Sequence, residues 1–335
     1  MTWSRARQTS EVSESSQVGS AFLSPASARV QRTHPAECMP YLKQAPPSGK
    51  RAMIDAALLE AETRERQTPV EKGVLDDVEH TWVWGLPLAR VSVEQTLDVV
   101  DRLIRRGEPS LVITANLHYA MLSHDDRRLA AVNRLAALLV ADGMPMIWYS
   151  RLTRRPLPER VAGADLIYLL SRQAAERGQR VFFLGGKPGV AAAAATKLSW
   201  MHPGLQVAGI EAPELESLSA REHDQLVERI REARPDLLFV AFGQPKGEIW
   251  LAENHRKLDV PVSIQVGASF DFVAGRATRA PHWVQRIGLE WLYRMGCEPK
   301  RLAPRYARDA WFLGKAIFRD AIAFAHKAAT AGRAG

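Results

Sequence analysis

Residues 180–189 read RVFFLGGKPG, an apolar run that ends in two glycines and precedes an alanine-rich segment of helical character. Residues 237–243 repeat the apolar pattern as LLFVAFG. Continuous apolar runs of this length are typical of parallel strands, because crossover helices cover both faces of such a sheet. The two runs therefore predict an α/β fold with a Rossmann-like, mostly parallel sheet flanked by helices.

Alternation of strands and helices extends in both directions from these runs. Further strands are expected at 81–84, 110–114, 137–141, 206–210 and 262–266, and helices at 93–106, 126–136, 164–177, 190–200 and 220–233. Residues 76–275 are thus expected to form the α/β core. Residues 1–75 are rich in Ser, Gln, Pro and charge, so a disordered or weakly structured extension is expected there, with room for a short helix at 51–66.

The whole net charge of +8 lies in the last 60 residues. Residues 276–335 hold 12 Lys and Arg against four Asp and Glu, whereas residues 1–275 hold 33 of each sign. Aromatic side chains such as Trp311 and Phe318 interleave with the arginines, which is typical of an interfacial helix on an anionic surface. A basic, amphipathic helical appendage is therefore expected at 276–335, and a helical cap on the core is the alternative. No nucleic-acid motif is present, so no nucleic-acid partner is expected.

Several classes of protein do not fit the composition. The two cysteines, Cys38 and Cys297, argue against a disulfide scaffold and fit a reducing cytosol. No run approaches the roughly 18–20 apolar residues of a membrane span, and the N-terminus lacks the apolar segment of a secretory signal. The histidines are scattered and no D-x-D pair occurs, so neither a metal site nor a cofactor is expected. The predicted location is cytoplasmic, peripheral on the inner face of the cell membrane.

Five of the expected strands end in polar or glycine-rich segments. These segments are TAN at 114–116, DG at 142–143, GGKPG at 185–189, GQPKGE at 243–248 and GASFD at 267–271. The carboxyl ends of parallel strands lie at one edge of the sheet, where ligands bind in such folds. Each segment alone reads equally well as a turn. Together they favour a nucleotide or nucleotide-sugar site, with glycines for close approach and a helix N-terminus for phosphate.

These segments, together with PERVAGAD at 158–165, RAP at 279–281 and LEWLYR at 289–294, resemble the WecG/TagA/CpsF glycosyltransferases. The resemblance extends over about residues 80–310. It implies an inverting, metal-independent transfer of an amino sugar or uronic acid from a UDP-sugar to an undecaprenyl-diphosphate-linked saccharide, in the synthesis of a cell-surface or extracellular polysaccharide. The anionic inner-membrane surface would then be a second partner, and a homo-oligomer stays open.

The resemblance and the strand ends together supply the candidate site. Asp142 matches the catalytic base of the family. The expected donor-binding residues are Thr114, Asn116, Arg160, Asp165, Gly185, Gly186, Gln244, Lys246, Glu248 and Asp271. The expected acceptor and membrane contacts are Arg279, Arg286, Arg294, Arg301 and Arg305.

One position departs from the family pattern G-x-P-[KR]-Q-E. Gly247 stands where the pattern has a glutamine that reaches the active site, and Gln244 is the candidate to reach the same space. A non-catalytic nucleotide-sugar-binding protein is therefore the alternative to an enzyme. A nicotinamide oxidoreductase fits less well, because the dinucleotide glycine fingerprint is missing.

Overall fold

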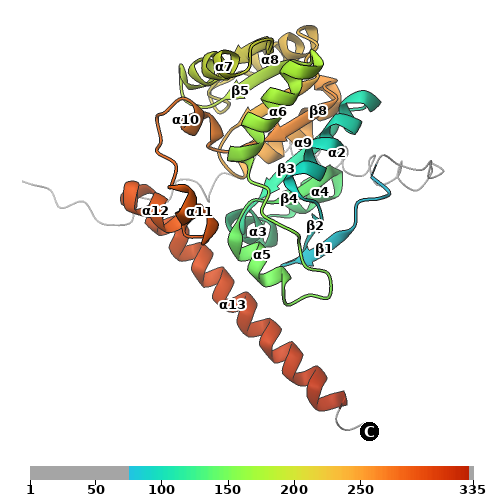
Figure 1. Ribbon diagram of the computed structural model, residues 1–335, viewed down its shortest axis with the longest axis vertical. Helices are drawn as coiled ribbons and strands as arrows, with labels where there is room; N and C mark the ends of the chain where they lie inside the picture. The colour runs from blue at the N-terminus through green and yellow to red at the C-terminus, as the bar shows by residue number, and fades with distance from the viewer. Residues whose placement is uncertain (1–74, 332–335) are drawn as a thin grey trace, which may run out of the picture. The chain divides into compact units, whose positions relative to one another are not determined.

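A computed structural model describes residues 75–331 of the chain (Figure 1). The predictions for residues 1–74, including the short helix at 51–66, lie outside this range.

Six parallel strands form the main sheet, which confirms the predicted fold class. In chain order they are β3 (Ser110–Ala115), β4 (Ala136–Ala141), β5 (Arg180–Gly185), β6 (Gln206–Glu211), β7 (Leu237–Ala241) and β8 (Val262–Gln265). They lie in the order β4-β3-β8-β7-β5-β6, and every neighbouring pair is parallel. All six carboxyl ends therefore share one edge of the sheet, as the strand-end argument requires.

The predicted strand at 81–84 is confirmed to within one residue, but it lies outside the parallel sheet. β1 (His80–Val83) pairs antiparallel with β2 (Leu86–Ala89) in a separate two-stranded sheet. Trp84 and Gly85 both have positive φ angles, of 49° and 83°, and turn the chain back on itself. Leu86 and Leu88 are buried in the same cluster as Ile113 of β3, so this hairpin covers part of the main sheet.

Helices cover the two faces of the sheet because alternate strand residues point to opposite sides. Phe183 and Phe239 pack on one face against α2 (Val93–Arg106), α6 (Gly163–Arg177), α7 (Val190–Met201) and α10 (Ser269–Val273). Phe182 and Leu184 pack on the other face against α8 (Ala220–Glu232) and α9 (Lys246–Leu258). The remaining helices of the core are α3 (Leu117–Asp125), α4 (Arg127–Leu135) and α5 (Met144–Ser150).

The helix predictions hold to within about two residues, and α2 agrees at both ends. The predicted helix at 126–136 is α4, which Asp126 caps through its side chain. It ends one residue early because Ala136 already belongs to β4. The helices α3, α5, α9 and α10 were not predicted.

The C-terminal segment is helical, as expected, and consists of α11 (His282–Arg286), α12 (Glu290–Cys297) and α13 (Pro299–Ala331). The inner face of α13 packs on α3 (Figure 1). It buries Ala316 in the apolar cluster that also contains Leu86 and Leu88 of the β1–β2 hairpin. Its outer face leaves Trp311 70% and Phe318 69% exposed. The two alternatives for this segment, a cap on the core and an amphipathic surface helix, thus describe opposite faces of α13. No helix in the described part of the chain is long and apolar enough to cross a membrane.

Candidate active site at the carboxyl edge of the sheet

Asp142 follows β4 directly at the carboxyl edge of the sheet. Its backbone N–H donates to the carbonyl of Ala115, 2.7 Å away, so the turn extends the pairing of β4 with β3. Its carboxylate accepts a long hydrogen bond of 3.4 Å from the backbone N–H of Gly163 at the start of α6. The Asp-Gly pair is therefore a turn that directs the carboxylate toward the beginning of a helix.

The surroundings of Asp142 raise its pKa from 3.8 to about 7. Loss of hydration on burial is the main cause, because a charged carboxylate is poorly stabilised away from water. The Arg160 charge opposes this rise, whereas the negative charges of Glu290 and Asp165 add to it. A carboxyl group with a pKa near 7 can accept a proton at neutral pH and is suited to act as a general base.

Two arginines and two acids form an ion-pair cluster beside Asp142. Arg279 binds both carboxylate oxygens of Asp165, at 2.5 and 2.9 Å. Arg160 donates to Glu290 at 2.8 Å and lies 3.7 Å from Asp165. Glu290 also lies 3.6 Å from the Nε atom of Arg279, which ties α12 to the core. Sequence reasoning placed Arg279 with the acceptor residues and missed Glu290 as a separate site residue.

Thr114 and Asn116 lie at the end of β3, beside the start of α6 and the Asp142-Gly143 turn. The buried Thr114 hydroxyl donates to the main-chain carbonyl of Gln265, 2.9 Å away on β8. The Asn116 side chain accepts from the backbone N–H of Tyr119 at 3.0 Å and so caps α3. A Cβ atom on Gly163 would lie 3.2 Å from the Thr114 hydroxyl, so α6 begins directly against this strand end.

The Gly185-Gly186 turn at the end of β5 requires glycine. Both residues have positive φ angles, of 98° and 78°. A Cβ atom on Gly185 would lie 2.9 Å from the Phe242 ring, and the Gly186 N–H donates to the carbonyl of Ala241 at 3.0 Å. No side chain in the described range caps α7, which begins four residues later at Val190. The Gly186 N–H is therefore already bonded, and the part of this segment that suits a phosphate is the uncapped first turn of α7.

The segment 243–248 joins the end of β7 to α9. Gln244 accepts a weak hydrogen bond of 3.5 Å from Arg305 on α13, and Lys246 forms an ion pair with Glu216. Glu248 is fully buried, and burial raises its pKa to about 7. Neither of its carboxyl oxygens has a hydrogen-bond partner of normal geometry among the described residues. Glu248 therefore lies behind the turn, with no surface open to solvent.

The remaining appendage arginines are spread along α11 to α13. Arg294 lies over the ring of Phe272, the residue after Asp271, 5.1 Å from the ring centroid. Arg301 binds Glu298 at 2.6 and 2.9 Å on the helix surface. Arg286 is exposed. The appendage thus brings Arg279, Arg294 and Arg305 to the carboxyl edge of the sheet. Glu298 and, more weakly, Asp271 raise the pKa of the exposed Arg301 guanidinium, so Arg301 lies within electrostatic range of Asp271. Arg286 faces solvent.

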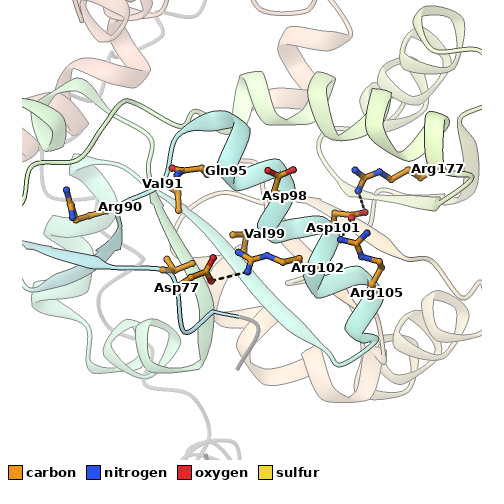
Figure 2. A pocket seen from close by; sticks show the side chains of 11 residues that line it. Asp77, Arg90, Val91, Gln95, Asp98, Val99, Asp101, Arg102, Arg105 and Arg177 are labelled. Carbon is orange, nitrogen blue, oxygen red and sulfur yellow. Dashed lines mark hydrogen bonds and ion pairs between the residues drawn. The ribbon is translucent and has the colours of Figure 1, made fainter. Parts of the chain in front are cut away.

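A charged cleft of about 430 Å³ lies along α2, away from Asp142 (Figure 2). Arg102 pairs with Asp77 at 3.0 Å, and Arg105 and Arg177 both pair with Asp101. Arg177 is the last residue of α6, whose first residue lies at the strand ends, so this cleft is at the opposite end of that helix. Its three carboxylates nearly balance its four arginines, and the carboxyl edge is the better candidate site.

No group of three or more His, Cys, Asp or Glu side chains within residues 75–331 is arranged to hold a metal ion. The polar groups that the structure places at the candidate site are arginines, carboxylates and backbone N–H groups. Such groups can bind a diphosphate and accept a proton.

Comparison with known proteins finds one matching family over most of the chain. Residues 81–326 match the glycosyl transferase WecG/TagA/CpsF family. A protein of Bacillus subtilis (strain 168) is 29% identical over 231 residues, which cover 67% of this chain and 88% of that protein. A protein of Bacillus spizizenii (strain ATCC 23059 / NRRL B-14472 / W23) is 30% identical over 196 residues, which cover 58% of this chain and 74% of that protein. Both are N-acetylglucosaminyldiphosphoundecaprenol N-acetyl-beta-D-mannosaminyltransferases.

Proposed function

Because the chain belongs to the WecG/TagA/CpsF family and is a glycosyltransferase, we propose that it moves a sugar from a UDP-sugar to an undecaprenyl-diphosphate-linked saccharide. The reaction inverts the anomeric carbon and uses no metal ion. The observation that carries this proposal is the position of Asp142, whose carboxyl has a pKa near 7 and adjoins Arg160. The names of the two relatives support an acceptor that carries a sugar on a lipid diphosphate.

The proposed mechanism is a single displacement. Asp142 takes the proton from an acceptor hydroxyl while the oxygen of that hydroxyl attacks the anomeric carbon of the donor sugar. The bond between that carbon and the UDP oxygen breaks, and its electron pair leaves with UDP. Arg160 and the backbone N–H groups at the start of α7, which follows the Gly185-Gly186 turn, stabilise the negative charge on the leaving diphosphate.

The donor and acceptor meet at the edge where the appendage joins the core. Thr114, Asn116 and Asp271 adjoin this edge from the core side, and Arg294 and Arg305 adjoin it from the appendage. An amino sugar is the favoured donor class, because both relatives are N-acetylmannosaminyltransferases. A uronic acid is the alternative class.

The outer face of α13 supports a peripheral contact with the anionic inner surface of the cell membrane. Trp311 and Phe318 are exposed there beside Lys315 and Arg319, and a groove of about 460 Å³ runs between α13 and α3. Aromatic and basic side chains on one helix face suit the boundary between lipid head groups and acyl chains. A cytoplasmic protein bound in this way would reach a lipid-linked acceptor without spanning the bilayer.

A screen of UDP-sugars tests the proposed function. The release of UDP is measured with and without a short-chain polyprenyl-diphosphate saccharide, using the wild-type chain and Asp142→Asn. We expect acceptor-dependent release from at least one UDP-sugar, and loss of that release in the variant. Binding of UDP-sugars without release from any of them would instead identify a non-catalytic nucleotide-sugar-binding protein, and binding of NAD but not UDP would refute both assignments.

A further inference from the structure

Gly247 lies directly against the side-chain amide of Gln265. A Cβ atom at position 247 would approach the Gln265 Nε2 atom far closer than 3 Å, and would lie 3.0 Å from its Cδ atom. Cβ atoms in proteins essentially never come so close to another heavy atom, because packed interiors cannot absorb such an overlap. The present position of Gln265 is therefore compatible only with glycine at position 247.

Gln265 uses the space beside Gly247 to connect two segments of the candidate site. It is the last residue of β8 and is 1% exposed. Its Nε2 atom donates to the carbonyl of Phe242 at 2.9 Å, and its Oε1 atom accepts from the N–H of Gly267 at 3.2 Å. The side chain thus links the end of β7 to the segment that follows β8. Buried amides that satisfy such backbone groups are costly to remove.

The main chain of Gln265 extends this connection to a third strand, since its carbonyl accepts from the Thr114 hydroxyl at the end of β3. Its amide also lies near Glu248, where the amides of Gln265 and Gln244 oppose the effect of burial on the pKa of that carboxyl. Gln244 does not take the space beside Gly247, because its own amide oxygen faces Arg305, 3.5 Å away.

We propose that Gln265 is a positioning residue for the donor site, and that Gly247 is the residue that admits it. The Gln265 amide holds the segment 243–248, with Gln244 and Lys246, against the ends of β7 and β8. In this chain the amide beside position 247 comes from β8 and not from α9. The inference rests on the proposed function, because the geometry of this segment affects turnover only if the donor binds at this edge.

A double-mutant cycle tests the pair. The variants are Gly247→Ala, Gln265→Ala and the two combined, with Gln265→Met as a variant that keeps the side-chain length and removes both hydrogen bonds. Gly209→Ala on β6 is the matched control, because a Cβ atom there would overlap the Phe182 ring to a similar degree, away from the segment 243–248. The readouts are KM and kcat for UDP release from the UDP-sugar, and the unfolding temperature with and without UDP.

We expect Gly247→Ala and Gln265→Met each to raise the donor KM by about tenfold, the effect of one or two lost hydrogen bonds. The alanine at 247 should cause no further loss once Gln265→Ala has vacated the space, so the effects should not multiply. Gly209→Ala should lower the unfolding temperature and leave the donor KM unchanged.

Two results would overturn the inference alone. The first is a wild-type enzyme that turns over while the fold-changes of the two single variants simply multiply. The second is a Gln265→Met variant that behaves like Gly209→Ala, with a lower unfolding temperature and an unchanged KM, since this indicates a role in stability only. A wild-type chain that releases UDP from no UDP-sugar refutes the proposed function, and the positioning role with it.

Discussion

Replacement of Asp142 by asparagine separates catalysis from stability at the candidate base. Asparagine has nearly the same shape but cannot accept a proton at neutral pH, so turnover should fall by about 10²–10⁴-fold, the usual contribution of a general base. In the wild-type enzyme a pKa of about 7 means that the ionised fraction, and hence kcat, should fall by about tenfold between pH 8 and pH 6. Donor binding should change little, because in the proposed mechanism Asp142 contacts the acceptor hydroxyl and not the diphosphate of the donor.

The same substitution should stabilise the fold at alkaline pH. Because folding raises the pKa of Asp142 from 3.8 to about 7, its contribution to stability is complete below pH 3.8 and is lost as the pH rises through about 7. The difference between the two pKa values corresponds to at most about 4 kcal/mol in the free energy of unfolding. Asp142→Asn should therefore resist urea better than the wild type at pH 8, by an amount that shrinks toward pH 5.

The assays are UDP release across pH 5.5–8.5 and urea unfolding at pH 5 and pH 8. Asp98→Asn is the control, since Asp98 is an exposed carboxylate of α2 that lies outside the candidate site. Undiminished turnover in Asp142→Asn would remove Asp142 from the role of base. A wild-type kcat that is flat between pH 6 and pH 8 would show that no group with a pKa near 7 limits the reaction.

Three further predictions concern the groups around this site and the outer helix. Glu290→Gln removes a negative charge that raises the pKa of Asp142, so the midpoint of the kcat–pH profile should move to lower pH; an unmoved midpoint would disconnect the two carboxyls. Burial raises the pKa of Glu248 to about 7, so the contribution of this carboxyl to stability is lost as the pH rises through that value. Glu248→Gln should therefore raise the unfolding temperature more at pH 8 than at pH 5.5. An equal change at both pH values would contradict this. Trp311→Ser should weaken co-sedimentation of the protein with anionic vesicles several-fold. The control is Trp200→Ser, because Trp200 on α7 is at least as exposed, and it should leave co-sedimentation unchanged. Equal effects of the two variants would mean that any exposed tryptophan contributes to vesicle binding.

Much of the fold was predictable because the decisive signals are local. Apolar runs such as 181–184 identify buried strands, and the capping Ser92 marks the start of α2 within one residue. The hairpin was not predicted, because the pattern at 81–84 indicates a strand but not its partner. The turn at Trp84-Gly85 decides that partner, and it depends on positive φ angles that the pattern does not reveal. The short helices α5 and α10 lack a periodic apolar face long enough to detect.

The candidate site was predicted in part, and the limit lies in which segments meet. Asp142 was found because it directly follows a recognisable strand and matches a family pattern. The interaction of Glu290 with Arg160, 130 residues away in sequence, has no local signal. From the sequence, Gly247 indicates only that the glutamine of the family pattern is missing. The structure adds that the side chain of Gln265, from β8, lies beside Gly247.

The sequence by itself determined the α/β class, the polar and glycine-rich strand ends, the basic C-terminal helices and the family. Each of these depends on residue order along a single segment. Only the tertiary structure decided that Arg279 binds Asp165, that Glu290 binds Arg160 near Asp142, and that Gln265 occupies the space left by Gly247. Charge pairing, desolvation and steric exclusion act between atoms a few ångströms apart in space, whatever their separation along the chain.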